Sequence, residues 1–192
     1  MKQTKVIADR IYSGQGIVAD GLRIITANIL LVLCAQIAIP LPWSPVPITG
    51  QTFGVLFVAV LFGSRRGALA LLLYLLEGIS GLPVFQPFGL PGPARFFGPT
   101  AGYLLACPPA AFLTGWVLER GAMQSIRRVA SALLFGEAII FFGGCAWLAA
   151  GIGLGWSSAL RLGALPFIPG EIVKLTLIVA TVYGVKPARG KA

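Results

Sequence analysis

The sequence predicts an all-α membrane protein whose 192 residues form a single membrane domain, a bundle of six transmembrane helices. The first observation is composition: 57% of the residues are hydrophobic and 11% are charged, whereas a soluble domain carries about 25% charged residues. The second is segmentation, because long apolar runs alternate with short basic segments. We expect a cytoplasmic N-terminal segment at 1–20, the bundle at 21–184 and a basic cytoplasmic tail at 185–192.

The first two helices share a charge-free stretch that runs from Ile24 to Ser64. Such a stretch is too long for one span of about 20 residues. Four prolines between Pro40 and Pro47 interrupt it, and a residue that precedes proline disfavours the helical conformation. We therefore expect one helix over about 21–39 and a second over about 49–62.

Four further apolar segments predict the remaining helices, over about 67–80, 100–118, 129–151 and 166–183. Pro166 suits the first turn of the sixth helix. The second and third spans are short for a bilayer, so we expect one of them to be tilted, broken or partly re-entrant. An external loop rich in glycine, proline and aromatic residues, from Gly81 to Gly98, separates the third and fourth helices.

The basic residues fall unevenly between the two ends of these helices, with twelve at one end and two at the other. The twelve are Lys2, Lys5, Arg10, Arg23, Arg65, Arg66, Arg120, Arg127, Arg128, Lys186, Arg189 and Lys191. The two are Arg95 and Arg161. Because positive charge accumulates on the cytoplasmic side, this asymmetry predicts cytoplasmic termini in a multi-pass protein of the bacterial cytoplasmic membrane.

Several chemistries are disfavoured by the residues the chain contains. It has no histidine, which excludes the usual Ser-His and Cys-His nucleophiles and HExxH zinc sites. The sequence GISG at 78–81 matches the GxSG motif of rhomboid-type proteases but has no histidine base. There is no GxxxxGK[ST] phosphate loop, and the three cysteines lack metal-binding spacing. We expect no enzyme activity, no cofactor, no metal and no nucleic-acid partner.

Four ionisable residues within the apolar segments are candidates for a functional role, because each costs several kcal/mol in a bilayer unless it is paired or hydrated. Glu171 and Lys174 are three residues apart and share one helix face; they predict either a polar site or a self-contained ion pair. Glu137 fits a pairing with a loop arginine at least as well as a role in transport. Glu77 fits either a site or an interfacial position.

The external loop and the start of the fourth helix supply possible partners for that face. Phe85, Phe88 and Tyr103 are aromatic, and Gln86 and Arg95 are polar. Together they fit either an interfacial aromatic belt or a lid over a small apolar ligand with a polar head.

Three segments resemble the BioY family, the biotin-capturing S components of energy-coupling factor transporters. They are Ala35–Leu56, which contains PVPIT; Gly81–Leu104, which contains GLPVF and GPTAGYL; and Pro166–Lys174, which reads PFIPGEIVK. The resemblance implies external capture of biotin. It also implies delivery inward with a transmembrane coupling subunit and two ABC-type ATPase subunits.

The resemblance also suggests roles for the candidate residues. Glu171, where the family usually has aspartate, would accept the ureido N–H groups of biotin, Lys174 would donate to the ureido oxygen, and Gln86 could do either. Phe85, Phe88 and Tyr103 would cover the rings. Arg95 would bind the ligand carboxylate, although Lys174 could exchange with it.

Small residues on the first helix are expected to dock on the membrane partner in this family. Ala27 and Ala35 fit that pattern, and Leu31 interrupts it. Alternatives to biotin capture are an S component for another vitamin of the thiamin or riboflavin type, or a passive facilitator.

Overall fold

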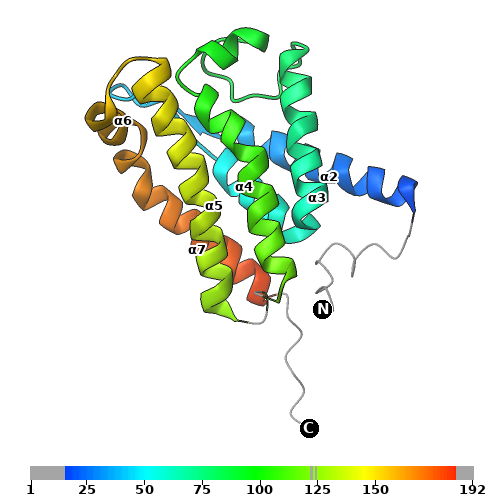
Figure 1. Cartoon of the computed structure of the whole chain (residues 1–192). Helices are drawn as coiled ribbons and strands as arrows, with labels where there is room; N and C mark the ends of the chain where they lie inside the picture. The colour runs from blue at the N-terminus through cyan, green and yellow to red at the C-terminus, as the bar shows by residue number, and fades with distance from the viewer. Residues whose placement is uncertain (1–15, 122, 124, 185–192) are drawn as a thin grey trace.

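The computed structural model describes residues 16–121, 123 and 125–184, and within them the chain is helical (Figure 1). The helices are α2 (Ile17–Gln36), α3 (Gln51–Ile79), α4 (Ala101–Glu119), α5 (Ile126–Ala146), α6 (Trp156–Gly163) and α7 (Ile168–Gly184). The shorter elements are the antiparallel pair β1 (Ala38–Ile39) and β2 (Ile48–Thr49), the 3-10 turns η1 (Gly92–Phe97) and η4 (Leu165–Phe167), and the π turn η3 (Trp147–Gly151). Five helical segments in this part of the chain are long and apolar enough to cross a membrane.

The long element α3 consists of two helical arms that fold back on each other at Gly63. Gly63 has φ 83° and ψ −174°, a conformation that side-chain-bearing residues rarely adopt. In a continuous helix Ala59 and Gly67 would lie about 12 Å apart along the axis. Instead, a Cβ on Gly67 would stand 3.4 Å from the Ala59 Cα. The two arms correspond to the second and third helices predicted from the sequence.

Residues of α4 hold this reversal in place. The Glu119 carboxylate accepts hydrogen bonds from the Ser64 amide, at 2.7 Å, and from the Ser64 hydroxyl, at 2.8 Å. Ser64 begins the second arm, so a carboxylate there satisfies an unpaired amide and complements the helix dipole. Gly115 allows the close approach, because a Cβ at that position would lie 2.5 Å from the Ser64 nitrogen.

Polar contacts fix α2 beside the second arm of α3. Asp20 pairs with Arg66 at 2.8 Å at one end, and the Gln36 amide donates to the carbonyl of Phe85 at 3.1 Å at the other. Between them, Asn28 donates to the Glu77 carboxylate at 2.9 Å. The structure thus assigns Glu77 to the helix interface, and the residue does not line the pocket described below.

The small residues of α2 lie inside this interface. Ala27, Leu31 and Ala35 are all completely buried, in the core cluster that also contains residues of α3. Small side chains permit the closest helix approach, which explains why they face α3. Ala27 and Ala35, for which the sequence predicted contact with a membrane partner, are therefore covered by α3 and do not lie on the surface.

Seven of the described basic residues divide between the two ends of the bundle. One end contains the Gly63 reversal, the end of α4, the start of α5 and the end of α7 (Figure 1). Arg65, Arg66, Arg120, Arg127 and Arg128 lie at this end. Arg95 and Arg161 belong to loops and short elements of the opposite end. The predicted N-terminal segment and basic tail, with Lys2, Lys5, Arg10, Lys186, Arg189 and Lys191, fall outside the described residues, except for positions 16–20.

Candidate functional site

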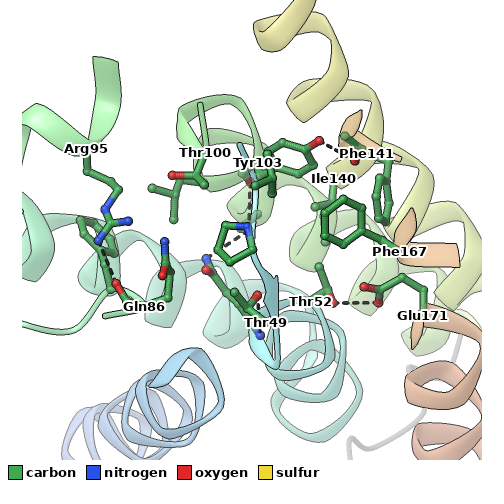
Figure 2. A pocket seen from close by; sticks show the side chains of 17 residues that line it. Thr49, Thr52, Gln86, Arg95, Thr100, Tyr103, Ile140, Phe141, Phe167 and Glu171 are labelled. Atoms are coloured by element: carbon green, nitrogen blue, oxygen red, sulfur yellow. Dashed lines mark hydrogen bonds between the residues drawn. The ribbon is translucent and has the colours of Figure 1, made fainter. Parts of the chain in front are cut away.

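A pocket lies at the end of the bundle that carries Arg95 (Figure 2). It is bordered by the first turns of α3, α4 and α7 and by the later part of α5. It is lined by Val46, Pro47, Thr49, Gln51, Thr52, Phe85, Gln86, Arg95, Thr100, Tyr103, Leu104, Cys107, Ile140, Phe141, Gly163, Phe167 and Glu171. Five of the seven predicted binding residues are among them. The exceptions are Lys174 and Phe88.

Glu171 forms one end of the pocket, where α7 meets the start of α3. Its side chain is 8% exposed. One carboxylate oxygen accepts from the Lys174 ammonium at 2.7 Å, and the other accepts from the Thr52 hydroxyl at 2.8 Å. A carboxylate has about four lone-pair sites, so Glu171 keeps acceptor capacity for N–H donors in the pocket.

Lys174 lies behind Glu171 and holds it against α3. Its ammonium donates to Glu171, to the Thr52 hydroxyl at 2.9 Å and to the Thr49 carbonyl at 2.6 Å. An ammonium has three N–H donors, and these three contacts use all of them. In this arrangement Lys174 orients Glu171, whereas the role predicted from the sequence was a direct contact with the ligand.

Arg95 lies at the opposite end of the pocket from Glu171 (Figure 2). It is 5% exposed and lies in η1. Its terminal nitrogens donate to the carbonyls of Gln86, at 2.8 Å, and Phe88. Among the described residues its Nε has no hydrogen-bond partner, and no carboxylate there forms a salt bridge with the guanidinium.

The burial of Arg95 has an electrostatic consequence. Desolvation lowers the pKa of its guanidinium, and the nearby Tyr74 opposes this shift. A buried cation is stabilised by an anion that can accept its free donor. The Arg95 end of the pocket is thus suited to a carboxylate.

Gln86 and Phe88 organise the loop around Arg95. The Gln86 amide oxygen accepts from the Phe88 backbone nitrogen at 2.8 Å, and its NH₂ donates to the Phe88 carbonyl. Gln86 is 5% exposed and lines the pocket, whereas the Phe88 side chain is 41% exposed and lies outside it. Phe88 instead borders a neighbouring hollow.

Aromatic rings form the apolar walls between the two polar ends. Tyr103 meets Phe141 edge to face at 6.0 Å, and Phe141 lies 6.2 Å from Phe167. The Tyr103 hydroxyl donates to the Gly163 carbonyl at 2.6 Å and so is satisfied within the protein. Phe85 packs edge to face on Tyr74 at 5.2 Å. Phe85 and Tyr103 therefore face the pocket, which favours the ligand-lid interpretation over an interfacial belt for these two residues.

The neighbouring hollow connects the pocket to the loops. It lies between residues 40–47 and 86–100 and shares Pro47, Gln86, Arg95 and Thr100 with the pocket. Ser44 anchors the first of these loops by donating to the Leu162 carbonyl at 2.7 Å.

Polar residues at the start of α3 also line the pocket and were not predicted from the sequence. Thr49, Gln51 and Thr52 all line the pocket. They belong to the PVPITGQT stretch, where hydroxyl and amide side chains occur between two apolar helices. Phe141 and Phe167 were also missed, because an aromatic residue on an apolar helix carries no separate signal for a ligand wall.

Glu137 lies in the interior of the bundle and does not contact the loop arginines. It is 7% exposed, and neither of its carboxylate oxygens has a hydrogen-bond partner among the described residues. The expected pairing with a loop arginine is therefore wrong. The reason is distance, because Arg128 lies nine residues earlier on the same helix, about 13 Å along its axis.

Comparison with protein families gives a match over nearly the whole chain. The model of the BioY family matches residues 4–191. The "Biotin transporter BioY" of Rhizobium etli is 37% identical over 170 residues, which cover 85% of this chain and 89% of the relative. The "Probable biotin transporter BioY" of Pyrococcus horikoshii is 39% identical over 140 residues, covering 73% and 79%.

A solved structure is similar in fold. It is the crystal structure of the S-component for biotin from an ECF-type ABC transporter. The TM-score is 0.80 at 28% sequence identity, and the alignment covers 88% of this chain and 91% of the other.

Proposed function

The chain belongs to the BioY family, and from that premise we propose that it is the S component of an ECF-type transporter, which captures biotin and delivers it inward. It is a multi-pass membrane protein and not an enzyme. The site residues and the topology within the membrane are further parts of this proposal.

The ligand assignment depends on one observation, the separation of two different polar ends by aromatic walls. Glu171 offers acceptors at one end, and Arg95 is a buried cation without a salt-bridge partner among the described residues at the other. Biotin has two ureido N–H donors, an apolar thiophane ring and a carboxylate on a flexible chain. We propose that Glu171 accepts a ureido N–H group and that Arg95 binds the carboxylate.

The aromatic residues and the amides complete the proposed site. Phe85, Tyr103, Phe141 and Phe167 would cover the apolar rings of biotin. The ureido oxygen needs a donor, and the Lys174 donors are already occupied. Gln51 fits this role, because its amide makes only a long 3.9 Å contact to the Cys107 sulfur.

We further propose that the chain crosses a prokaryotic cytoplasmic membrane six times, with both termini in the cytoplasm. The reversal at Gly63 divides α3 into two helical arms, each of which would be one span, and the arginines at 65, 66, 120, 127 and 128 share the proposed cytoplasmic end. The pocket then opens outward. A test is to place single cysteines at the exposed positions 127 and 161 in a background lacking the native ones. An impermeant thiol reagent on intact cells should label position 161 alone.

Energy for uptake would come from partner subunits. The chain has no phosphate loop of the GxxxxGK[ST] type, so ATP hydrolysis by that route requires an ABC-type ATPase module, attached through a transmembrane coupling subunit. Vesicles that contain only this chain should equilibrate biotin at most. Accumulation there with ATP would contradict the need for partners, and rapid equilibration would favour a passive facilitator.

The experiment that tests the ligand is isothermal titration of the purified chain in detergent with biotin, thiamin and riboflavin. Biotin should bind with the highest affinity by at least about a hundredfold, since a buried arginine disfavours cationic thiamin and riboflavin lacks a carboxylate. Comparable binding of either other vitamin would overturn the assignment to biotin.

A further inference from the structure

Glu137 is a buried carboxyl group that the proposed biotin site leaves without a role. It lies on α5, where its neighbour Gly136 packs against Thr114 of α4 and Leu56 of α3. Glu137 interacts electrostatically with Glu171 and Lys174 of α7 and with the Cys107 thiol of α4. It therefore lies close to the polar end of the pocket.

The contact between Glu137 and Glu171 requires a proton. The two carboxyl groups interact electrostatically, and Glu137 lies one helical turn before Ile140 and Phe141, which line the pocket together with Glu171. Two ionised carboxylates are both acceptors and cannot hydrogen-bond, which agrees with the lack of a donor for either Glu137 oxygen. A proton on one of them supplies the missing donor.

The charge balance leads to the same conclusion. Two carboxylates share one cation, and the three Lys174 donors are used by Thr49, Thr52 and Glu171. With both glutamates ionised, the cluster would hold one net negative charge in the apolar interior. An uncompensated buried carboxylate is costly enough that it is normally protonated instead.

No other described charge on the elements packed against α5 compensates Glu137. On α4, Glu119 is bound to Ser64 at the far end, and on α3, Glu77 is bound to Asn28. Arg161 of α6 is exposed. The remaining described basic residues are Arg95 at the far end of the pocket, Arg23, which is bound to Asp20, and the arginines at 65, 66, 120, 127 and 128, which lie at the opposite end of the bundle. Tyr74, Tyr103 and Tyr183 are neutral phenols at neutral pH.

We propose that Glu137 holds a proton in the resting protein and donates it as a hydrogen bond to Glu171. Glu171 then remains an oriented carboxylate toward the ligand, and the cluster of Glu137, Glu171 and Lys174 is neutral. Glu137 is a positioning residue in this scheme, and the inference rests on the proposed biotin site. Since alkaline conditions remove the proton and add a charge that repels Glu171, biotin affinity should fall as pH rises and be retained at neutral pH.

A spectroscopic experiment tests the proton directly and needs no ligand. The chain has only four glutamates, so ¹³C-glutamate labelling isolates their infrared bands. The unliganded protein at neutral pH should show a protonated carboxyl band equivalent to one glutamate. Glu137→Gln should abolish it, and the matched control Glu77→Gln should retain it. Absence of the band in the wild-type chain overturns the proposal even if every variant misfolds.

Biotin titration between pH 7 and pH 9.5 supplies the functional readout. Wild-type affinity should fall about tenfold across this range. Glu137→Gln, which mimics the protonated acid, should bind within about threefold of wild type at neutral pH and show no alkaline loss. If Glu137→Gln kept the wild-type pH profile, the proposal would be overturned. It would also be overturned if wild-type affinity depended on sodium or potassium and Glu137→Gln removed that dependence, because a metal cation would then compensate Glu137 in place of a proton. Failure of the wild-type chain to bind biotin would instead refute the proposed function, while the infrared band would still decide the protonation of Glu137.

Discussion

Lys174 donates a 2.7 Å hydrogen bond to Glu171, one helical turn before it on α7. The same ammonium reaches the Thr49 carbonyl and the Thr52 hydroxyl. This ion pair therefore does more than neutralise a buried charge, because it joins α7 to the start of α3 and fixes the direction of the Glu171 carboxylate.

The first prediction concerns this pair. Glu171→Gln retains the shape but loses the charge, so it should weaken biotin binding by about 1.5–3 kcal/mol, or about ten- to hundredfold. Lys174→Met should have a similar effect, since it leaves the carboxylate without its cation. Isothermal titration measures both.

The double variant Glu171→Gln with Lys174→Met separates binding from structure. If Glu171 contacts biotin, the double variant stays weak even where its thermal stability recovers. Near-native affinity in the double variant would show that the two residues are only a structural ion pair, and the site assignment would fail.

The second prediction concerns Arg95 and the ligand carboxylate. Wild-type protein should bind biotinamide, which lacks the carboxylate, about ten- to hundredfold more weakly than biotin. Arg95→Gln should bind both compounds equally, at about the biotinamide level. Titration of the two ligands against the two proteins forms a double-mutant cycle. A wild-type protein that binds the two compounds equally would exclude Arg95 as the carboxylate ligand.

The helical architecture was largely predictable from the sequence, because hydropathy and proline placement reflect local physics. The prolines between Pro40 and Pro47 separate α2 from α3 as expected, and the gap between the second and third predicted helices coincides with the reversal at Gly63. The short helix α6 was not predicted. Its eight residues include a glycine, two serines and an arginine, which do not stand out from a loop.

The site was predictable only in part, since contacts between distant segments decide it. Glu171 and Arg95 were identified because charge in an apolar chain is conspicuous. The role of Lys174 was not, because its partners Thr49 and Thr52 lie more than 120 residues away in sequence. The neighbours of Ala27 and Ala35 were not predictable for a related reason, because a small residue marks a close contact without indicating whether the neighbour is this chain or another.

The third prediction tests the cap between α4 and α3. Glu119→Ala removes both acceptors of Ser64, so it should lower the free energy of unfolding by about 1–2 kcal/mol, as expected for loss of a helix cap. Unfolding in mixed micelles would measure the change. Biotin affinity should stay within about twofold of wild type, because Glu119 does not line the pocket. In a double-mutant cycle with Ser64→Ala, additive effects would contradict a direct contact between the two side chains.

The last prediction links helix packing to the pocket through Gly78 and Phe85. A Cβ on Gly78 would lie 2.0 Å from the Phe85 ring, which cannot be accommodated without moving the ring. Phe85 lines the pocket and packs on Tyr74. Gly78→Ala should therefore lower biotin affinity by at least about tenfold and destabilise the fold by about 1–3 kcal/mol through overpacking.

Gly21→Ala is the matched control, because Gly21 also lies in a helix but has nothing within 4 Å of its Cβ position. Phe85→Leu combined with Gly78→Ala should recover stability, since the smaller side chain leaves room for the added methyl, while affinity remains low. Native affinity in Gly78→Ala would show that Phe85 does not contact the ligand.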